Sequence, residues 1–454
     1  MSTIVAISTA PISGGIGIVR MSGEKSFDII KKIFIPINKK KKIDGYTMQY
    51  GKIVDNNKTI DEVIVSFFVE PKSYTTENMC EINSHGGIVV VKKILELCLK
   101  NGAELAEPGE FTKRAFLNGR IDLSQAEAVA DLINAKTNKE AEVSINQLEG
   151  FLSSKIKEIK GGILDLLINI EANIDYPEYD VEETTYKQAI ANLEIEKEKL
   201  IKLRDSFNSG RIIKDGIKTV ILGRPNAGKS SLLNELAKQE KAIVTDIEGT
   251  TRDAIEEEII ISGIPFKIID TAGIRKTTNK VEEIGINKAK NLAENADLII
   301  AIFDISKELN EEDIEILNIL KNKKAIILLN KFDLEKNNKI NINKINEYGK
   351  KIIKTSMINK EGIDDLYKTL IEMFELNEIS IENTATITNE RHKILIEATI
   401  NNIEKAISDL KENVPIDIVS INIKNAIENL NEITGENATE DLIKGIFSKF
   451  CLGK

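Results

Sequence analysis

The sequence predicts a multidomain chain that combines α/β and all-α domains, with an α/β domain inserted into a helical domain. Three observations support this fold class. The chain has 454 residues, which is too long for a single hydrophobic core. Strand-like segments dominate its first part, and long amphipathic helical patterns follow. A strand-rich block then returns before helices resume, as happens when one domain is inserted into another.

These changes of pattern set the expected domain boundaries. We predict a strand-rich N-terminal domain over residues 1–118 and an inserted α/β domain over residues 215–377. The helical domain is predicted in two halves, residues 119–214 and residues 378–454.

Local patterns predict the individual elements. Short runs rich in Val, Ile and Phe, bounded by Gly and Pro, are typical of strands, and a 3.6-residue apolar period is typical of helices. We expect strands within residues 3–8, 15–23, 61–71 and 79–87. We expect helices at residues 87–102, 123–137, 143–176, 187–207, 398–413, 418–435 and 441–454.

Composition excludes several classes of protein. No apolar stretch approaches the roughly 18 residues that a membrane span needs, so no membrane association is expected. Three widely spaced cysteines and two histidines form neither a disulfide framework nor a zinc site, which favours the reducing cytoplasm. The net charge of −10 is unusual for an isolated high-affinity nucleic-acid binder. If RNA is a partner, local basic patches or another protein must supply the attraction.

A phosphate-binding loop stands at the start of the inserted domain. "TVILGRPNAGKSSLLNEL" is a buried strand, then G-x-x-x-x-G-K-S, then a helix, which is the context that this motif requires. Gly223 and Gly228 allow the tight turn, Lys229 reaches the β- and γ-phosphates, and Ser230 is an expected Mg²⁺ ligand. From this loop we assign to the nucleotide site Asn226, Ala227, Gly228, Lys229, Ser230 and Ser231.

Two later motifs specify the nucleotide. "FKIIDTAG" brings Asp270 to the magnesium side, and its Gly273 amide can bond the γ-phosphate; Thr271 and Ala272 lie between them. In "AIILLNKFD", Asp333 can accept hydrogen bonds from two guanine N–H donors, which adenine does not offer. Asn330 supports the base and the loop, and the Lys331 stem covers the ring. Together these motifs predict a guanine nucleotide hydrolase; an ATPase is the alternative that N-K-x-D argues against.

A fifth G motif is expected at "KTSMINKEGI", with Ser356 near the base. Met357 and Ile358 stand where Ala and Lys are usual, so this motif departs from the common pattern.

The residue that orients the attacking water is not evident from these motifs. Ile274 occupies the place of the Gln that Ras-type enzymes use. "GTTRD" supplies a switch in which Thr251 is the expected second Mg²⁺ ligand. Arg252 and Arg275 are candidates for an arginine finger, but their pattern agrees at least as well with a solvent-exposed or salt-bridge role. Asn226 offers another solution, since its side-chain carbonyl can help to hold a monovalent cation beside the phosphates.

The terminal "KFCLGK" places Cys451 three residues from the chain end. It is not a prenylation box, because Gly453 and Lys454 do not fit C-a-a-X. Residue type alone favours a buried cysteine at the end of a helix.

Several segments together resemble one family. "GRPNAGKSSLLN", "TDIEGTTRD", "DTAGIR", "VEEIGI", "NKFD", "NERH" and "FCLGK", with the N-terminal "TIVAISTAPISGGIGIVRMSG", are similar to the MnmE (TrmE) family of tRNA-modification GTPases. The resemblance covers the whole chain. Departures are small: Thr76 and Asn78 stand where the family usually has Gly and Asp.

The resemblance implies a specific activity. Family members are homodimers built on N-terminal folate-binding domains, with an all-α helical domain and an inserted Ras-like P-loop G domain. They work with MnmG, a flavoprotein that carries FAD, in a heterotetramer. With a tetrahydrofolate one-carbon unit (a 5-formyl or 5,10-methylene form), they add an aminomethyl or carboxymethylaminomethyl group to carbon 5 of the wobble uridine of certain tRNAs. GTP is the nucleotide, and the location is cytoplasmic.

The resemblance also implies a potassium site and a catalytic glutamate. Asn226 matches the K⁺ ligand, and Glu282 matches the residue that orients the attacking water, although by itself Glu282 would be interpreted as a solvated charge. The switch loop that completes the K⁺ site contributes Thr245, Ile247 and Thr250. Its residues assigned to GTP binding are Thr245, Asp246, Ile247, Glu248, Gly249, Thr250 and Thr251.

The folate site implied by the resemblance contains Arg20, Glu81, Arg120 and Lys454. The chemistry fits, because folate carboxylates favour Arg and Lys, and the N–H donors of the pterin favour a carboxylate. Cys451 then becomes a candidate for thiol chemistry, or its tail simply covers the pocket.

Two functions stay open from the sequence. The first is a K⁺- and Mg²⁺-dependent GTPase that drives wobble-uridine modification. The alternative is a G-protein switch in ribosome assembly, against which the N-terminal domain and the tail argue.

Overall fold

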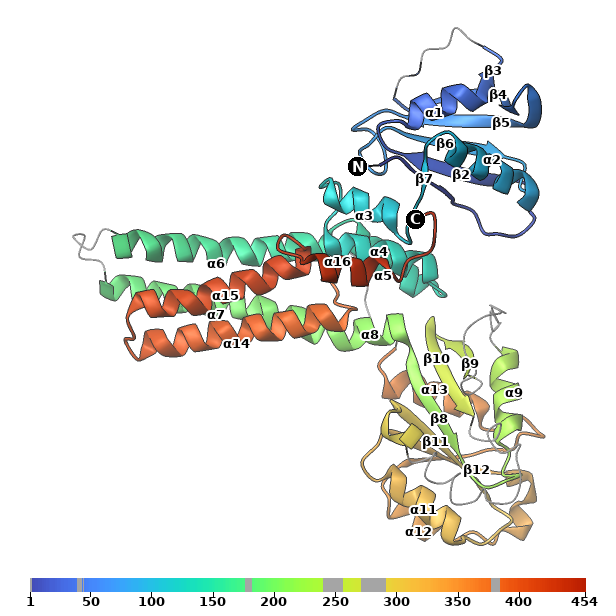
Figure 1. Cartoon of the computed structure of the whole chain (residues 1–454). Helices are drawn as coiled ribbons and strands as arrows, with labels where there is room; N and C mark the ends of the chain where they lie inside the picture. Colours follow the sequence, from blue (N-terminus) through green and yellow to red (C-terminus); the bar gives the residue numbers. More distant parts are fainter. Residues whose placement is uncertain are drawn as a thin grey trace. The chain divides into compact units, whose positions relative to one another are not determined.

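The computed structural model describes residues 2–38, 43, 45–175, 182–239, 256–270, 291–376 and 384–454. They form two compact units (Figure 1). The first comprises residues 1–133, 144–204 and 390–454, and the second comprises residues 134–143 and 205–389. The mixed α/β and all-α class is confirmed. The four-part domain division stays a prediction.

The N-terminal part of the first unit contains a seven-stranded sheet among its described residues, in the order β3-β4-β5-β6-β2-β1-β7. Its strands include those expected within residues 3–8, 15–23, 61–71 and 79–87. They are β1 (Ile4–Ile7), β2 (Gly17–Ser22), β3 (Phe34–Pro36), β4 (Thr47–Asp55), β5 (Lys58–Phe68), β6 (Met79–Ser84) and β7 (Glu104–Leu105).

Helices cover one face of this sheet; the other, called the uncovered face below, is covered among the described residues only over β1, where Phe111 packs against Ile4 and Ala6. Helices α1 (Ser26–Ile33) and α2 (Ile88–Lys100) bury their apolar sides in the core that the strands share. Along β5, Val63, Val65 and Phe67 alternate with more exposed residues, which is the period-2 pattern of a strand with a single covered face. Side chains on the uncovered face, such as Arg20 and Glu81, are therefore available for binding.

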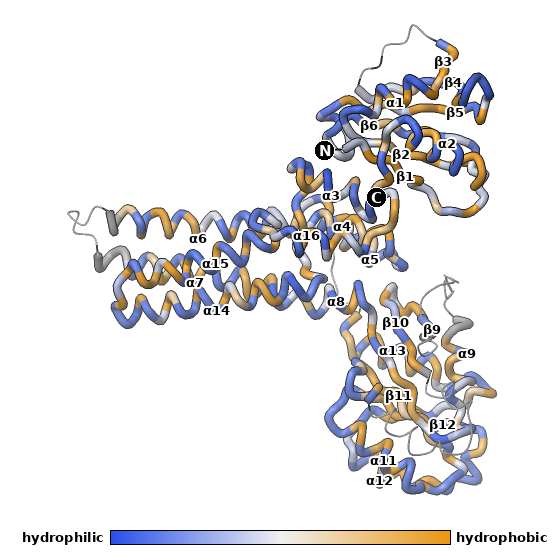
Figure 2. Tube along the Cα trace, viewed as in Figure 1, coloured by the Kyte–Doolittle hydropathy of each residue, from blue (hydrophilic) through white to orange (hydrophobic). Residues whose placement is uncertain are grey.

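Helices make up the rest of the first unit. Four long ones, α6, α7, α14 and α15, line up as a bundle whose inner positions are mostly Ile and Leu (Figures 1 and 2). The helices are α3 (Glu110–Leu117), α4 (Leu123–Asn134), α5 (Asn138–Leu148), α6 (Phe151–Asp175), α7 (Glu182–Asp205), α14 (Glu390–Lys411), α15 (Ile416–Thr434) and α16 (Glu440–Phe447).

Two expected helices are wrong in extent. The pattern over residues 143–176 predicts one helix, but the chain breaks at Gly150, whose φ of 90° is left-handed, so α5 and α6 are separate. The pattern over residues 441–454 predicts a helix to the chain end, but α16 ends at Phe447. There the tail leaves the helix and binds the N-terminal sheet.

The second unit is a doubly covered α/β sheet with the described strand order β13-β12-β11-β8-β10-β9. Five strands are parallel and β9 is antiparallel. Every residue of β11 and β12 is buried, as expected for parallel strands covered on both faces (Figure 2). The strands are β8 (Ile217–Leu222), β9 (Glu256–Ile261), β10 (Ile264–Asp270), β11 (Leu298–Asp304), β12 (Ala325–Asn330) and β13 (Lys351–Lys354).

The helices of this unit pack on both faces of the sheet. α9 and α13 contribute to the core on one face, and α11 and α12 contribute to the core on the other. The helices whose bounds lie within the described residues are α8 (Phe207–Asp215), α9 (Lys229–Gln239), α11 (Glu311–Leu320), the 3-10 helix η2 (Phe332–Asn337), α12 (Ile342–Asn346) and α13 (Ile363–Met373). Within the described ranges, no helix is long and apolar enough to cross a membrane.

A buried ionic cluster ties the start of α14 to α4 and α15. The His392 Nε2 atom lies 2.8 Å from the Glu127 carboxylate, and Arg391 Nη2 lies 3.1 Å from it. Arg391 also donates to the carbonyl of Glu432 on α15. Burial alone would raise the pKa of Glu127, but His392 and then Arg391 outweigh it and lower that pKa to about 2.

Glu127→Gln is expected to destabilise the first unit. At pH 7 the variant should lose about 3 kcal/mol, because it leaves the Arg391 guanidinium without its anion inside the protein. The pKa of Glu127 in the folded state lies below its ordinary value of 4.5. The loss of stability in the variant should therefore be full above about pH 4.5 and become smaller as the pH falls toward 2. Thermal melting followed by circular dichroism at several pH values measures this. Glu404→Gln, at an exposed position of α14, is the control, and equal melting of the two variants would contradict the prediction.

Candidate functional site

The phosphate loop lies at the carboxyl end of β8, and its two glycines are structurally required. Gly223 has a φ of 154°, and a Cβ there would lie 2.5 Å from the carbonyl oxygen of Ile302. Gly228 has a φ of 112°, and a Cβ there would collide with the side-chain amide of Asn330. No other residue type fits these two positions without strain.

The loop holds its cationic and hydroxyl groups at the start of α9. Lys229 is buried, and its Nζ donates to the carbonyls of Gly223 (2.6 Å) and Arg224 (2.9 Å). Ser230 and Ser231 follow in the first turn of the helix, where N–H groups point toward an anion. The ammonium, two hydroxyls and the helix amides thus converge on one place.

The base-recognition motif is bound to this loop. Asn330 is only 2% exposed, and its Nδ2 donates to the carbonyl of Ala227 over 2.7 Å. Asp333 accepts a hydrogen bond from Ser356 Oγ over 2.6 Å, which brings the fifth-motif serine beside the carboxylate. The predicted residues Asn330, Asp333 and Ser356 therefore lie together.

Lys331 is held across the same edge of the sheet. It adopts a left-handed φ of 66°, and its Nζ lies 2.6 Å from Asp304 Oδ2 at the end of β11. Burial would raise the pKa of Asp304, but hydrogen bonds from Lys331 and Ser306 more than offset it and lower that pKa. Asp304 therefore stays ionised and anchors the lysine, a contact that the sequence motif alone did not predict.

These groups line a cavity of about 520 Å³. Its described lining includes residues that sequence reasoning did not assign: Pro225, and the apolar pair Met357 and Ile358. The pair replaces the usual Ala and Lys, yet it supplies apolar surface of the kind that a flat base packs against. The full described lining is Pro225, Asn226, Gly228, Lys229, Ser230, Ser231, Asn330, Lys331, Asp333, Met357 and Ile358.

Part of the predicted site lies outside the described residues. Asp270 ends β10 and pairs in register with Ile221 of β8, so its backbone reaches the same sheet edge as the phosphate loop. The predicted residues outside the described ranges are Thr245, Asp246, Ile247, Glu248, Gly249, Thr250, Thr251, Thr271, Ala272, Gly273 and Glu282.

A second group of predicted residues gathers on the uncovered face of the N-terminal sheet. Arg20 on β2 and Glu81 on β6 are register partners, and both Arg20 Nε and Nη2 lie 2.8 Å from Glu81 Oε1. Each side chain is 18% exposed, so the pair is partly open to solvent.

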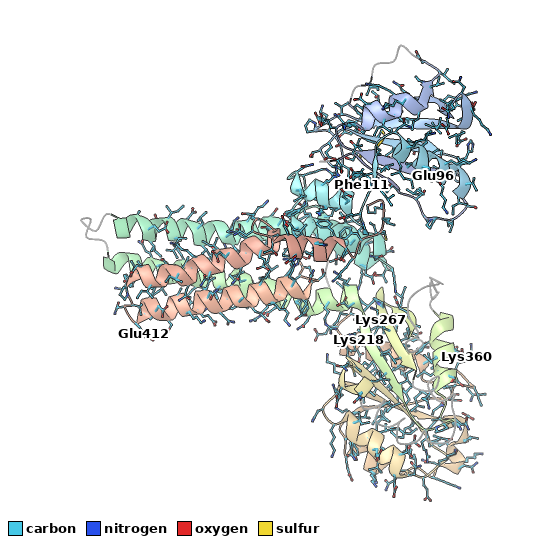
Figure 3. The ribbon with its side chains drawn as sticks, viewed as in Figure 1. Glu96, Phe111, Lys218, Lys267, Lys360 and Glu412 are labelled. Carbon is cyan, nitrogen blue, oxygen red and sulfur yellow. The ribbon has the colours of Figure 1, made fainter. Side chains whose placement is uncertain are left out.

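Aromatic rings frame this pair. The Arg20 guanidinium lies 5.6 Å from the ring centroid of Phe111 and 5.8 Å from that of Tyr74. Arg120 lies 4.8 Å from the same Tyr74 ring and donates to the Tyr74 carbonyl over 3.1 Å. Neither Tyr74 nor Phe111 was predicted. The Tyr74 ring brings the two arginines together, and Phe111, which is labelled in Figure 3, lies beside Arg20.

The C-terminal tail is bound at the same place. The Gly453 carbonyl accepts hydrogen bonds from Ser8 Oγ (3.0 Å) and Arg20 Nη1 (3.3 Å), and the Phe111 amide donates to the Lys454 carbonyl (3.2 Å). Gly453 has a φ of 87°, and a Cβ there would collide with the carbonyl of Ile7. The structure thus brings Arg20 and Glu81 to the tail that carries Lys454.

The expectation of a buried Cys451 is wrong. The thiol is exposed, because the chain leaves α16 before this residue and the tail binds through backbone groups. Cys80 and Cys98 are both buried, and burial raises the pKa of Cys98 to about 12 and that of Cys80 well above its ordinary value. Cys451 is therefore the accessible thiol of the chain.

Comparisons with known proteins agree with this geometry. The MnmE helical domain model matches residues 123–451, and the model of the N-terminus of the GTP-binding protein TrmE matches residues 3–120. The chain is 52% identical to the tRNA modification GTPase MnmE of Acetivibrio thermocellus, over all of this chain and 99% of that protein. It is 49% identical to those of Finegoldia magna, over 99% of each chain, and Clostridioides difficile, over 100% of this chain and 99% of that one.

The chain belongs to the MnmE family of tRNA-modification GTPases. It is therefore a GTP-hydrolysing enzyme that acts in tRNA modification and interacts with GTP and tRNA. This membership favours tRNA modification over the alternative of a switch in ribosome assembly.

An MnmE-family GTPase binds its nucleotide with magnesium, and the described residues fit that ion. Mg²⁺ prefers oxygen ligands and is held by few protein groups together with phosphate oxygens. Ser230 offers such an oxygen at the wall of the cavity, beside the Lys229 ammonium. When bound, Mg²⁺ neutralises charge on the transferred phosphate.

Proposed function

We propose that this GTPase works with the flavoprotein MnmG to modify carbon 5 of the wobble uridine of certain tRNAs, using a tetrahydrofolate one-carbon unit. The added group is aminomethyl or carboxymethylaminomethyl. The observation that carries the proposal is the binding of the C-terminal tail to Arg20. It gathers Arg20, Glu81, an exposed thiol and the C-terminal tail within the first unit of a GTPase.

The chemistry of this group suits a folate. Arg20, Arg120 and Lys454 can pair with folate carboxylates, and Glu81 can accept from pterin N–H groups. Tyr74 and Phe111 offer aromatic surface for the flat ring system. We propose that Cys451 takes part in thiol chemistry at the one-carbon unit. The simpler alternative is that the tail only covers the folate site.

On the nucleotide side we propose a potassium-dependent reaction. Asn226 belongs to the phosphate loop and lines the cavity. Its backbone has a left-handed φ of 62°, as the tight turn of the loop requires. Its side-chain oxygen would hold K⁺ beside the phosphates, together with Thr245, Ile247 and Thr250. The ion would supply the positive charge that an arginine finger supplies elsewhere. Glu282 would orient the attacking water, and Thr251 would complete the Mg²⁺ shell.

We also propose a homodimer built on the N-terminal sheet. Its uncovered face carries exposed apolar side chains on β3 to β5, such as Met48 (54% exposed) and Tyr50 (49% exposed). Strand register places Met48 in line with Ser66, Glu81 and Arg20, so the apolar surface continues into the proposed folate site. A second copy would cover this surface. A heterotetramer with MnmG, which carries FAD, and a cytoplasmic location complete the proposal.

Arg20→Gln is expected to lose folate affinity. Removing the guanidinium takes away one cation of the site, so binding of 5-formyltetrahydrofolate should weaken at least about tenfold. Isothermal titration calorimetry measures the affinity, and nucleoside analysis of tRNA from cells that carry the variant should reveal unmodified wobble uridine. GTP hydrolysis should persist.

Lys52→Gln is the matched control, because Lys52 lies on β4 at the same face of the sheet as Arg20 and pairs only with Glu62 among the contacts described. It should bind folate as the wild type does. Full folate affinity in Arg20→Gln would contradict the proposed site.

Exchanging K⁺ for Na⁺ is expected to slow GTP hydrolysis at least roughly tenfold, because the smaller Na⁺ ion fits a site shaped for K⁺ poorly. The effect should be large, since an arginine finger, whose charge K⁺ would replace, raises kcat by about 10³- to 10⁵-fold. Asn226→Ala should be slow in both salts. Phosphate release at saturating GTP measures the rates, and GDP affinity in each salt is the control. Equal rates of the wild type in K⁺ and Na⁺ would refute the cation role of Asn226.

A further inference from the structure

The charge of the chain is strongly uneven in the second unit. Between Lys321 and Lys354 the sequence contains ten lysines and three acidic residues, a formal charge of +7, whereas the whole chain carries −10. Lys331 belongs to the nucleotide site and is paired with Asp304. The nine other lysines are called the lysine band below.

The lysine band occupies one edge of the sheet. Three of its members follow α11 into β12, three lie on the crossover from β12 to β13, and three lie at β13, the last strand of the sheet. Figure 2 shows the chain around α12 as largely hydrophilic. Buried Ile340 and Ile345 fix this crossover to the core, so its lysines project from a supported surface.

Direct contacts join the lysines before β12 and those at β13 to each other and to the crossover. Lys350 Nζ donates to the carbonyls of Lys321 (3.1 Å) and Lys323 (2.8 Å), which holds the loop before β12 against the start of β13. The Lys321 ammonium lies 5.7 Å from the ring centroid of Tyr348, and that of Lys354 lies 4.5 Å from the ring centroid of Phe332.

These lysines are not used for ion pairs. Among the described residues, none of the nine lies within ion-pair distance of a carboxylate, whereas Lys136, Lys160 and Lys360 elsewhere each have one. Protection of an edge strand against pairing with another chain explains lysines on β13 itself. It does not explain those on the crossover, for example the exposed Lys339 and Lys344.

We propose that the lysine band binds the phosphate backbone of tRNA, the substrate of this family. A cluster of ammonium groups without carboxylate partners is the electrostatic footprint of nucleic-acid binding, and a local patch is what an acidic chain needs for it. Neighbouring asparagines suit the same ligand. The side-chain carbonyls of Asn338 and Asn341 accept backbone hydrogen bonds, which leaves their amino groups to donate to phosphate or ribose.

The test removes three exposed lysines, Lys339, Lys344 and Lys351, by substitution with Gln in the full chain. Fluorescence anisotropy of labelled full-length tRNA, with GDP bound and between 50 and 200 mM KCl, gives the affinity and its salt dependence. We expect at least about a tenfold loss at the lower salt and a slope of log affinity against log salt that is shallower by about 2. Basal GTP hydrolysis should stay within about twofold of the wild type, since phosphate contacts act mainly on RNA affinity.

The matched control is the triple substitution of Lys58, Lys92 and Lys93 by Gln. These residues are exposed on the N-terminal sheet and on α2, and the variant has the same net charge. It should bind tRNA within about twofold of the wild type, because its lysines lie off the band. If the first variant folds poorly, as judged by GDP binding, Lys336→Gln with Lys344→Gln leaves β13 intact and should weaken tRNA binding in the same direction.

Three outcomes would overturn the proposal. The wild type does not bind tRNA; or the band variant loses no more affinity than the control does; or it keeps its tRNA affinity and instead loses binding to MnmG, in which case the band is a protein-binding surface. A loss confined to the band variants, with the reduced salt slope, supports it.

Discussion

One buried hydrogen bond, from Asn330 Nδ2 to the carbonyl of Ala227, joins the two halves of the nucleotide cavity. It connects the phosphate loop after β8 to the base-recognition motif after β12. Because a Cβ at Gly228 would collide with the Asn330 amide, the glycine and the asparagine depend on each other. A guanine nucleotide that contacts both halves therefore meets a site whose spacing is already set, so less binding energy is spent on ordering it.

The first unit uses the C-terminal tail in a comparable way. The last residues of the chain are not helical. Their carbonyls accept hydrogen bonds from the side chains of Ser8 and Arg20 and from the Phe111 amide. The glycine in "FCLGK" is needed because the backbone at Gly453 is left-handed and lies against β1. The buried Glu127 cluster fixes α14 to α4. Helix α4 comes after the N-terminal sheet in the chain, and α14 comes after the second unit, so the cluster joins two segments that are far apart in the sequence. The same chain thus supports a nucleotide site and a separate polar site, each built on a sheet.

Sequence patterns predicted what depends on local chemistry. The phosphate loop, N-K-x-D and the strands β1, β2, β5, β6 and β8 were predictable, because motif spacing, glycine placement and apolar period are local signals, whereas β3, β4 and β7 were not predicted. Several features of the two sites were not predictable. Asp304, Tyr74 and Phe111 reach their sites through pairings of distant segments that no local pattern encodes. Cys451 was expected to be buried from its residue type, whereas the backbone contacts of the tail decide its exposure. Met357 and Ile358 seemed a defect of the fifth motif until the cavity placed them in its wall.

The dependence of the phosphate loop on Asn330 is tested most directly by the affinities of Asn330→Ala for GDP and for inorganic pyrophosphate, which has no base. Loss of a buried hydrogen bond costs about 1–3 kcal/mol, or roughly 5- to 150-fold in affinity. If the bond to Ala227 holds the loop, both ligands should weaken by a similar factor. If GDP weakens while pyrophosphate binds as it does to the wild type, Asn330 contacts only the base and the loop keeps its shape without it.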